Sequence, residues 1–173
     1  MAKLKTIIDA EGTSAATKVL LDLLNEFPGI PEGMTIKFAT LEETGGISFN
    51  PTSGATYIEN REDITGHVYQ VCAYPFVIIF RSAARTEDRK ILIKEFLDLL
   101  ARWLEGDTVT IGGIDYKLEQ YPDLSSGDRK ITTIVTTNAS HCQAAYADGI
   151  EDWSISMTMR YKNDFLKGRP LGG

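Results

Sequence analysis

The sequence predicts an α+β fold: a mainly antiparallel β-sheet with two principal helices packed on one face, plus a long β-rich loop or arm. Three observations predict this class. Residues 74–106 contain an almost continuously apolar strand that leads into a strongly amphipathic helix. Another amphipathic segment lies near the N-terminus, and several further segments alternate apolar and polar residues, as half-buried strands do. The expected element order is therefore helix, strands, helix, strands.

Residues 13–27 predict the first helix. A threonine and a serine at its start can cap it, and Pro28 followed by glycine ends it. Its apolar residues recur on one helical face: Ala16, Val19, Leu20, Leu23, Leu24 and Phe27. A shorter helical segment is expected over about residues 3–10. Residues 34–38 alternate apolar and polar side chains, which predicts a half-buried strand.

The segment from Val68 to Ser82 predicts a long strand. Its second half is almost continuously apolar, so both faces of the strand are expected to be covered. Pro75 lies inside this strand. Because proline has no backbone N–H to donate to a β-ladder, a bulge or a sheet edge is expected at that position.

The main helix is expected over residues 87–105. Thr86 offers an N-cap oxygen, two acids occupy the first turn, and Gly106 is placed to end the helix in a left-handed conformation. Its apolar stripe follows the helical period and consists of Leu92, Ile93, Phe96, Leu97, Leu99, Leu100, Trp103 and Leu104. These residues predict a scaffold element that packs on the sheet.

The C-terminal half predicts more strands. Gly112 and Gly113 separate two short alternating runs, which is typical of a β-hairpin. Residues 130–137 are rich in isoleucine, valine and threonine and predict a strand. Residues 153–161 show the cleanest alternation in the chain. A single domain is therefore expected over residues 1–161, followed by a flexible tail over residues 162–173.

The segment from residue 41 to residue 66 is expected to be a long polar loop with brief strand-like pieces. Loops of this length in compact domains are usually functional or disordered. Scattered apolar side chains in such a loop gain free energy when another chain buries them. We therefore expect a subunit interface at Ile47, Phe49, Tyr57 and Ile58.

Composition and charge exclude some classes of function. The formal net charge of −6 argues against a protein that grips nucleic acid, which normally needs a basic patch. The N-terminal residues do not resemble a secretion signal, and no apolar run is long enough to cross a bilayer. Cys72 and Cys142 do not form a disulfide framework, so free thiols and an intracellular origin are expected.

His141 is the strongest catalytic candidate in the sequence. In the chloramphenicol acetyltransferase family a histidine acts as general base, with three residues between it and an Asp-Gly pair. Here six residues separate His141 from Asp148, so the two side chains would not be placed alike. We expect a histidine in a loop near a turn and no catalytic residue.

Metal and cofactor sites are not expected. His67, Cys72, His141 and Cys142 are the candidate zinc ligands, but they show no CxxC or HxxxH spacing. No phosphate-binding glycine motif occurs either.

Basic residues cluster where the long strand meets the main helix: Arg81, Arg85, Arg89 and Lys90. A DNA or phosphate site is one interpretation of this cluster. An exposed rim or a subunit contact is the other, and Arg81 and Arg85 therefore join the candidate interface residues.

Three motifs resemble a known family. They are the PTSGA sequence at residues 51–55, the YPF sequence at residues 74–76, and the helix that runs from RTEDRK to WLEG over residues 85–106. Together with the alternation around Trp153, they resemble the tail terminator and minor capsid proteins of long-tailed bacteriophages and prophages of Gram-positive bacteria. The resemblance covers about residues 45–161.

The resemblance implies a structural virion protein without enzymatic activity. Tail terminators form a ring, here expected to contain six copies, at the head-proximal end of the tail tube. The implied partners are other copies of the chain, the major tail tube protein and the head connector or stopper protein. DNA would transit the lumen without specific binding, and no membrane is involved. The alternatives are another head–tail connector or minor tail component, or a small acyltransferase-like enzyme that uses His141.

Overall fold

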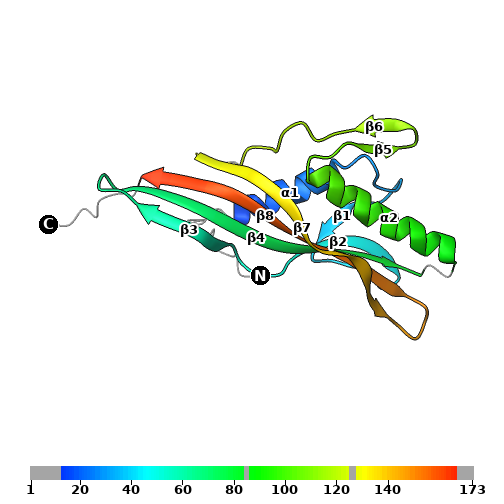
Figure 1. The fold of residues 1–173 in the computed structure, drawn as a ribbon. Helices are drawn as coiled ribbons and strands as arrows, with labels where there is room; N and C mark the ends of the chain where they lie inside the picture. The colour runs from blue at the N-terminus through cyan, green and yellow to red at the C-terminus, as the bar shows by residue number, and fades with distance from the viewer. Residues whose placement is uncertain (1–12, 84–85, 125–127, 167–173) are drawn as a thin grey trace.

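The structure is a computed structural model that describes residues 13–83, 86–124 and 128–166. The helical segment expected over residues 3–10 and the interface candidate Arg85 lie outside these residues. The elements follow the expected order (Figure 1): α1 (Thr13–Asn25), β1 (Ile36–Phe38), β2 (Gly45–Pro51), β3 (Thr56–Glu62), β4 (His67–Ser82), α2 (Glu87–Leu104), β5 (Val109–Ile111), β6 (Ile114–Tyr116), β7 (Asp128–Ala145) and β8 (Glu151–Leu166).

Strand β4 organises a six-stranded sheet. The strand order is β1-β2-β4-β8-β7, and β3 also pairs with β4. β8 runs antiparallel to β4 along its whole length. The other edge of β4 is shared, because β2 pairs with residues 76–82 and β3 pairs with residues 68–73. The sheet is antiparallel except for the β1–β2 pair, which confirms the predicted α+β class.

Pro75 lies where β4 changes partner from β2 to β3. The Pro75 carbonyl accepts a hydrogen bond from the Thr52 amide at 3.1 Å, in the segment that joins these two strands. The N and C=O groups of one strand residue point to the same side in an antiparallel ladder. The missing N–H of Pro75 therefore faces a gap in the ladder, so the expected local edge is present and costs no ladder hydrogen bond.

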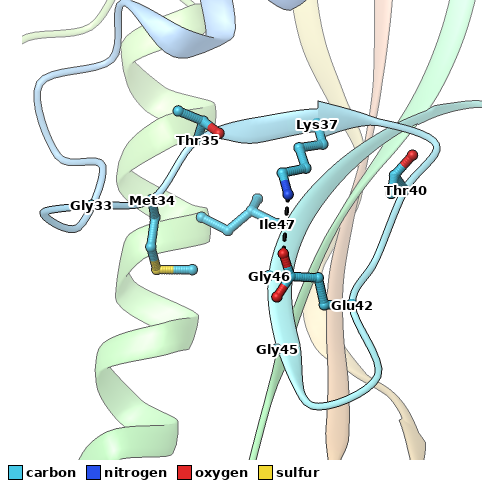
Figure 2. A pocket seen from close by; sticks show the side chains of 9 residues that line it. All are labelled: Gly33, Met34, Thr35, Lys37, Thr40, Glu42, Gly45, Gly46 and Ile47. Atoms are coloured by element: carbon cyan, nitrogen blue, oxygen red, sulfur yellow. Dashed lines mark hydrogen bonds and ion pairs between the residues drawn. The ribbon is translucent and has the colours of Figure 1, made fainter.

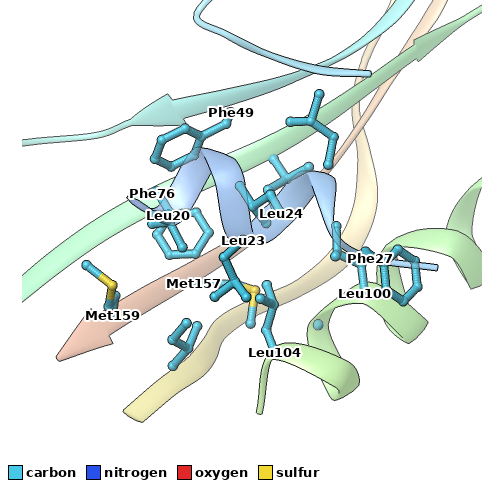
Figure 3. Packing of buried hydrophobic residues seen from close by; sticks show 14 of the residues in the cluster. Leu20, Leu23, Leu24, Phe27, Phe49, Phe76, Leu100, Leu104, Met157 and Met159 are labelled. Carbon is cyan, nitrogen blue, oxygen red and sulfur yellow. The ribbon is translucent and has the colours of Figure 1, made fainter. Parts of the chain in front are cut away.

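The helices α1 and α2 pack on one face of the sheet and enclose the hydrophobic core (Figure 3). On β4 every second side chain is buried, and those from Cys72 to Phe80 belong to this core. The cluster combines leucines of α1 and α2 with aromatic residues of β2 and β4 and methionines of β8: Leu20, Leu23, Leu24, Leu97, Leu100, Leu104, Phe49, Phe76, Met157 and Met159. Phe27, just beyond α1, packs against Phe96 and Trp103 of α2 with ring centroids 5.7 and 5.5 Å apart.

The second face of β4 differs from the expectation. Its side chains, among them Val77 and Ile79, are only partly buried because neither of the two described helices covers that face. The apolar run from Tyr74 to Phe80 predicted coverage of both faces. Small and polar side chains on neighbouring strands, such as Ser48 and Ser156, flank these residues in the sheet and shield them laterally. The sheet therefore has one core face and one open face.

Helix α2 begins and ends where the sequence predicts. Thr86 occupies the N-cap position with extended backbone, although its side chain makes no capping hydrogen bond. Gly106 has a φ of +89°, and the amides of Gly106 and Asp107 donate to the carbonyls of Trp103 and Arg102. This pair of hydrogen bonds is a Schellman motif, which requires a left-handed residue at Gly106.

The Gly106→Ala substitution is expected to lower the free energy of unfolding by about 1–2 kcal/mol, because a Cβ atom disfavours the left-handed backbone. The matched control is Gly54→Ala. No atom lies within 4 Å of a Cβ at either position, but the φ of Gly54 is outside the left-handed region. Urea unfolding checks the pair, and equal effects of the two substitutions would contradict the argument.

The expected loop over residues 41–66 is mostly sheet. β2 and β3 occupy residues 45–51 and 56–62 and pair with β4. β1 pairs with β2 in parallel, although only six residues connect them. Parallel strands usually need a longer crossover. The connection must run back along the length of β1 before β2 can begin. Because β1 has only three residues, this length is about 10 Å, which six residues can span.

The glycine hairpin is confirmed as β5 and β6, with φ angles of +59° at Gly112 and +80° at Gly113. β7 is longer than predicted and extends through His141 to Ala145.

The expected flexible tail begins inside a strand. β8 continues to Leu166, and residues 162–166 pair with β4, so the expectation of a flexible tail is wrong for these residues. The rest of the expected tail, 167–173, lies outside the described residues.

Candidate assembly interface

The four apolar interface candidates separate into two groups. Ile47 and Phe49 are 1% and 0% exposed and belong to the core, since β2 presents both side chains to the helices. They are therefore not available to a neighbouring subunit, which corrects the expectation from their place in a polar segment. Tyr57 and Ile58 are exposed, as is all of β3. A bulge between Tyr57 and Glu59 leaves Ile58 outside the β3–β4 register.

The β3–β4 hairpin forms an arm that projects beyond both helices (Figure 1). Its tip is a tight turn organised by Asp63, whose carboxylate accepts hydrogen bonds from the Thr65 hydroxyl at 2.6 Å and from the Thr65 and His67 amides at 2.9 and 3.1 Å. These bonds, the Thr65 hydroxyl foremost, lower the pKa of Asp63. The turn holds Ile64 fully exposed to solvent. An ordered turn thus presents an apolar side chain at the end of the arm.

Arg81 lies in a polar cluster at the opposite end of β4. It pairs in register with Asp152 of β8, and its Nε and Nη2 donate to the two carboxylate oxygens at 2.7 and 2.9 Å. The Tyr146 hydroxyl donates to the same carboxylate at 3.0 Å, and Arg81 Nη1 donates to the Glu42 carbonyl at 3.4 Å. This cluster joins the segment before β2, β4, β8 and the β7–β8 turn.

The Arg81 charge is neutralised by a carboxylate that is buried beneath it. The side chains of Arg81 and Asp152 are 21% and 6% exposed. Hydrogen bonding to Arg81 lowers the pKa of Asp152, with burial acting against it and the Tyr146 hydroxyl adding to it. The same pair raises the pKa of Arg81. The geometry supports a structural role for Arg81, because its donors already contact residues of its own chain.

A second ion pair holds α2 against β8. Lys90 Nζ contacts Glu151 at 2.9 Å, and the indole N–H of Trp153 donates to the same carboxylate at 3.0 Å. The hydrogen bond from Lys90 lowers the pKa of Glu151. Burial raises the pKa of the neighbouring Cys142 thiol, and Glu151 adds to this effect. Two members of the predicted basic cluster, Arg81 and Lys90, therefore stabilise the fold.

The catalytic candidates are engaged locally. His141 lies in strand β7 and not in a loop, and its Nδ1 contacts the Ala139 carbonyl at 2.9 Å. Asp148 lies in the β7–β8 turn and accepts a hydrogen bond from the Ile150 amide at 3.2 Å. Within the described part of the chain, no hydrogen bond joins His141 to Asp148.

The metal-ligand candidates also lie in different environments. Cys72 is buried in the core and Cys142 is on the surface. His67 stacks on Tyr69 with ring centroids 4.3 Å apart. Among residues 13–83, 86–124 and 128–166, no group of three or more potential metal ligands occurs.

A hollow between β1 and the start of β2 is shown in Figure 2. Its volume is about 280 Å³, and the exposed ion pair of Lys37 and Glu42, 3.0 Å apart, spans one side. The remaining lining includes Met34, Thr35 and Gly46. This volume is just below the range of typical ligand sites, which begins at about 300 Å³. Neither helix in the described ranges is long and apolar enough to cross a membrane.

One exposed surface, on α2, is not among the interface residues expected from the sequence. Ile91 and Leu92 of α2 are 57% and 62% exposed, although Leu92 follows the apolar stripe. The stripe is wider than the surface that the sheet and α1 can cover at this end of the helix. The sequence did contain a signal for this surface. Ile91 lies off the apolar stripe, so an aliphatic side chain at that position is expected to be exposed beside Leu92.

No protein-family model matches the sequence. No curated protein matches it either. Among solved structures, a chain from the virion of a native gene transfer agent particle aligns with a TM-score of 0.43 and 10% sequence identity, covering 91% of this chain and 100% of that chain.

Proposed function

We propose that this chain is a structural virion protein of a long-tailed phage or prophage: a tail terminator that forms a ring at the head-proximal end of the tail tube. The ring contains six copies, ends tube polymerisation and joins the tube to the head connector or stopper protein. DNA passes through its lumen without specific binding. The protein acts in the virion, after assembly in the host cytoplasm, and performs no catalysis.

Two observations support the proposal, besides the motif resemblance in residues 51–55, 74–76 and 85–106. The buried carboxylate of Asp152 and the partly buried guanidinium of Arg81 form an ion pair that ties elements of the same subunit together. Large apolar side chains are instead exposed on the arm and on α2, among them Ile64 and Leu92. This second observation carries the proposal, because Ile91 and Leu92 are adjacent on a regular helix and contiguous exposed apolar side chains mark surfaces that bind other protein chains.

Assembly of the purified chain tests the proposal. Light scattering after size-exclusion chromatography is expected to give a particle of about 115 kDa, six times the 19.1 kDa chain, alone or on tube ends. Negative-stain images should show rings. When the tube protein of the same phage polymerises with the chain present, the tubes should be shorter and capped at one end. Uncapped tubes of unchanged length would contradict the proposal.

A further inference from the structure

Three cations form a patch on the open face of the sheet. Lys130 of β7 lies directly opposite Lys162 of β8, and Arg160 lies two residues along β8 on the same face. All three side chains are exposed, and none of them forms an ion pair within the described residues. Like charges placed directly opposite one another destabilise a sheet. An anionic partner would remove this repulsion.

The patch has apolar neighbours. In the register of β4 and β8, Lys162 lies opposite Val71, and Arg160 lies opposite Ala73. Both β4 side chains are only partly buried. An acid, Asp164, follows Lys162 on the next position of the same face, at the edge of the patch. The three basic side chains thus lie on the β7 and β8 side of a partly buried strip at Val71 and Ala73, and Glu59 of β3 pairs with Val71 on the other side.

The exposed face of α2 has the complementary composition. Asp88, Ile91, Leu92 and Glu95 are spaced by three and four residues, so they share one helical face. All four are exposed. Neither acid forms an ion pair within the described residues. The face therefore consists of two large aliphatic side chains flanked by two unpaired carboxylates.

These two surfaces lie at opposite ends of the molecule. Figure 1 shows the N-terminal half of α2 at one end and the start of β7 with the end of β8 at the other. The surfaces therefore cannot meet within one subunit. A two-fold contact centred on the cationic patch would place the patch against itself. A contact between the two different surfaces avoids this repulsion, and such head-to-tail contacts generate rings when the rotation closes.

We propose that the Asp88–Glu95 face of α2 in one copy binds the Lys130, Arg160 and Lys162 patch on the sheet of the next copy. Carboxylates of the helix pair with the three cations, while Ile91 and Leu92 cover the strip at Val71 and Ala73. This inference rests on the proposed ring and assigns its subunit contact.

Charge reversal tests the contact. Lys162→Glu and Glu95→Lys are each expected to weaken self-association on the order of tenfold or more, because each places like charges together. The double variant Lys162→Glu/Glu95→Lys should recover association, since it exchanges the two charges. A 1:1 mixture of the two single variants should also associate, because each supplies the surface that the other lacks. Sedimentation velocity at fixed ionic strength measures all four samples.

The matched controls are Lys18→Glu and Glu26→Lys, which make the same charge changes at exposed positions on and beside α1. They are expected to associate like the wild-type chain. Recovery in the mixture also shows that both single variants fold. Leu92→Ser, which changes no charge, should weaken association similarly.

The outcomes separate this contact from the ring itself. If the wild-type chain forms rings and the single variants form them equally well, or if the mixture fails while the variants remain folded, the assigned contact is wrong and the ring stands. A wild-type chain that remains monomeric both alone and on tube ends would overturn the contact and the proposed function together.

Discussion

Replacing Leu97 with alanine is expected to lower the free energy of unfolding by about 2–5 kcal/mol, because a buried leucine side chain is lost and a cavity remains. Leu97 is 0% exposed and lies in the cluster that joins α2 to α1 and the sheet. Neighbouring side chains from three layers of structure limit how far the cavity can collapse. Urea unfolding followed by circular dichroism measures the change, in dilute solution so that subunit association does not contribute.

Leu92→Ala is the matched control for this prediction. It removes the same atoms from the same helix, but Leu92 is 62% exposed. Its effect on the monomer should remain within about 0.5 kcal/mol, as for most surface substitutions. Comparable losses at the two positions would mean that the covered and open faces of α2 have been assigned incorrectly.

Asp152→Ala is expected to lower the free energy of unfolding by about 2–3 kcal/mol. Breaking a buried ion pair costs more than losing an exposed one, because the remaining charge stays unpaired. Here Asp152 is 6% exposed, but Arg81 is 21% exposed and still reaches water, which places the cost between the two limits. In a double-mutant cycle, the Asp152→Ala/Arg81→Ala variant should lose less free energy of unfolding than the sum of the losses in the two single variants.

The effect of Asp152 also depends on pH. Its pKa in the folded chain is below the ordinary value of 3.8. A carboxylate with a lowered pKa stabilises the fold fully above its unfolded pKa, and this contribution is lost as the pH falls through the folded pKa. The difference between wild type and Asp152→Ala should therefore be constant near neutral pH and shrink below about pH 4.

Asp107→Ala is the control for the ion pair. Arg102 and Asp107 are 3.8 Å apart, and both side chains are 58% exposed. Removing this carboxylate should cost less than about 1 kcal/mol. If Asp152→Ala is no more destabilising than Asp107→Ala, the Arg81 cluster does not tie the end of the sheet together.

Some elements could be predicted because their signals are local. The helices α1 and α2 follow from apolar residues at helical spacing, and Gly106 ends α2 because the backbone there needs a positive φ. The β5–β6 turn follows in the same way from Gly112 and Gly113. Each of these features depends on residues within a few positions of one another, so one sequence contains the required information.

Other features could not be predicted because they depend on distant partners. β3 has all seven residues exposed and is a strand only because β4 offers it an unpaired edge. Residues 45–51 contain two glycines and a proline, which suggested a loop, yet β4 and β1 pair with them on both sides. His141 lies in β7 because β8 extends far enough to pair with it.

The candidate interface shows the same difference between local sequence signals and tertiary packing. By itself the sequence determined the α+β class, the two helices and the apolar residues that need burial, because hydrophobic period and turn chemistry are properties of neighbouring residues. Only the tertiary structure decided which of those residues the core covers: Ile47 and Phe49 are inside, while Tyr57, Ile58, Ile91 and Leu92 are outside. Burial of a side chain depends on the elements packed over it, and these come from segments far away in the chain.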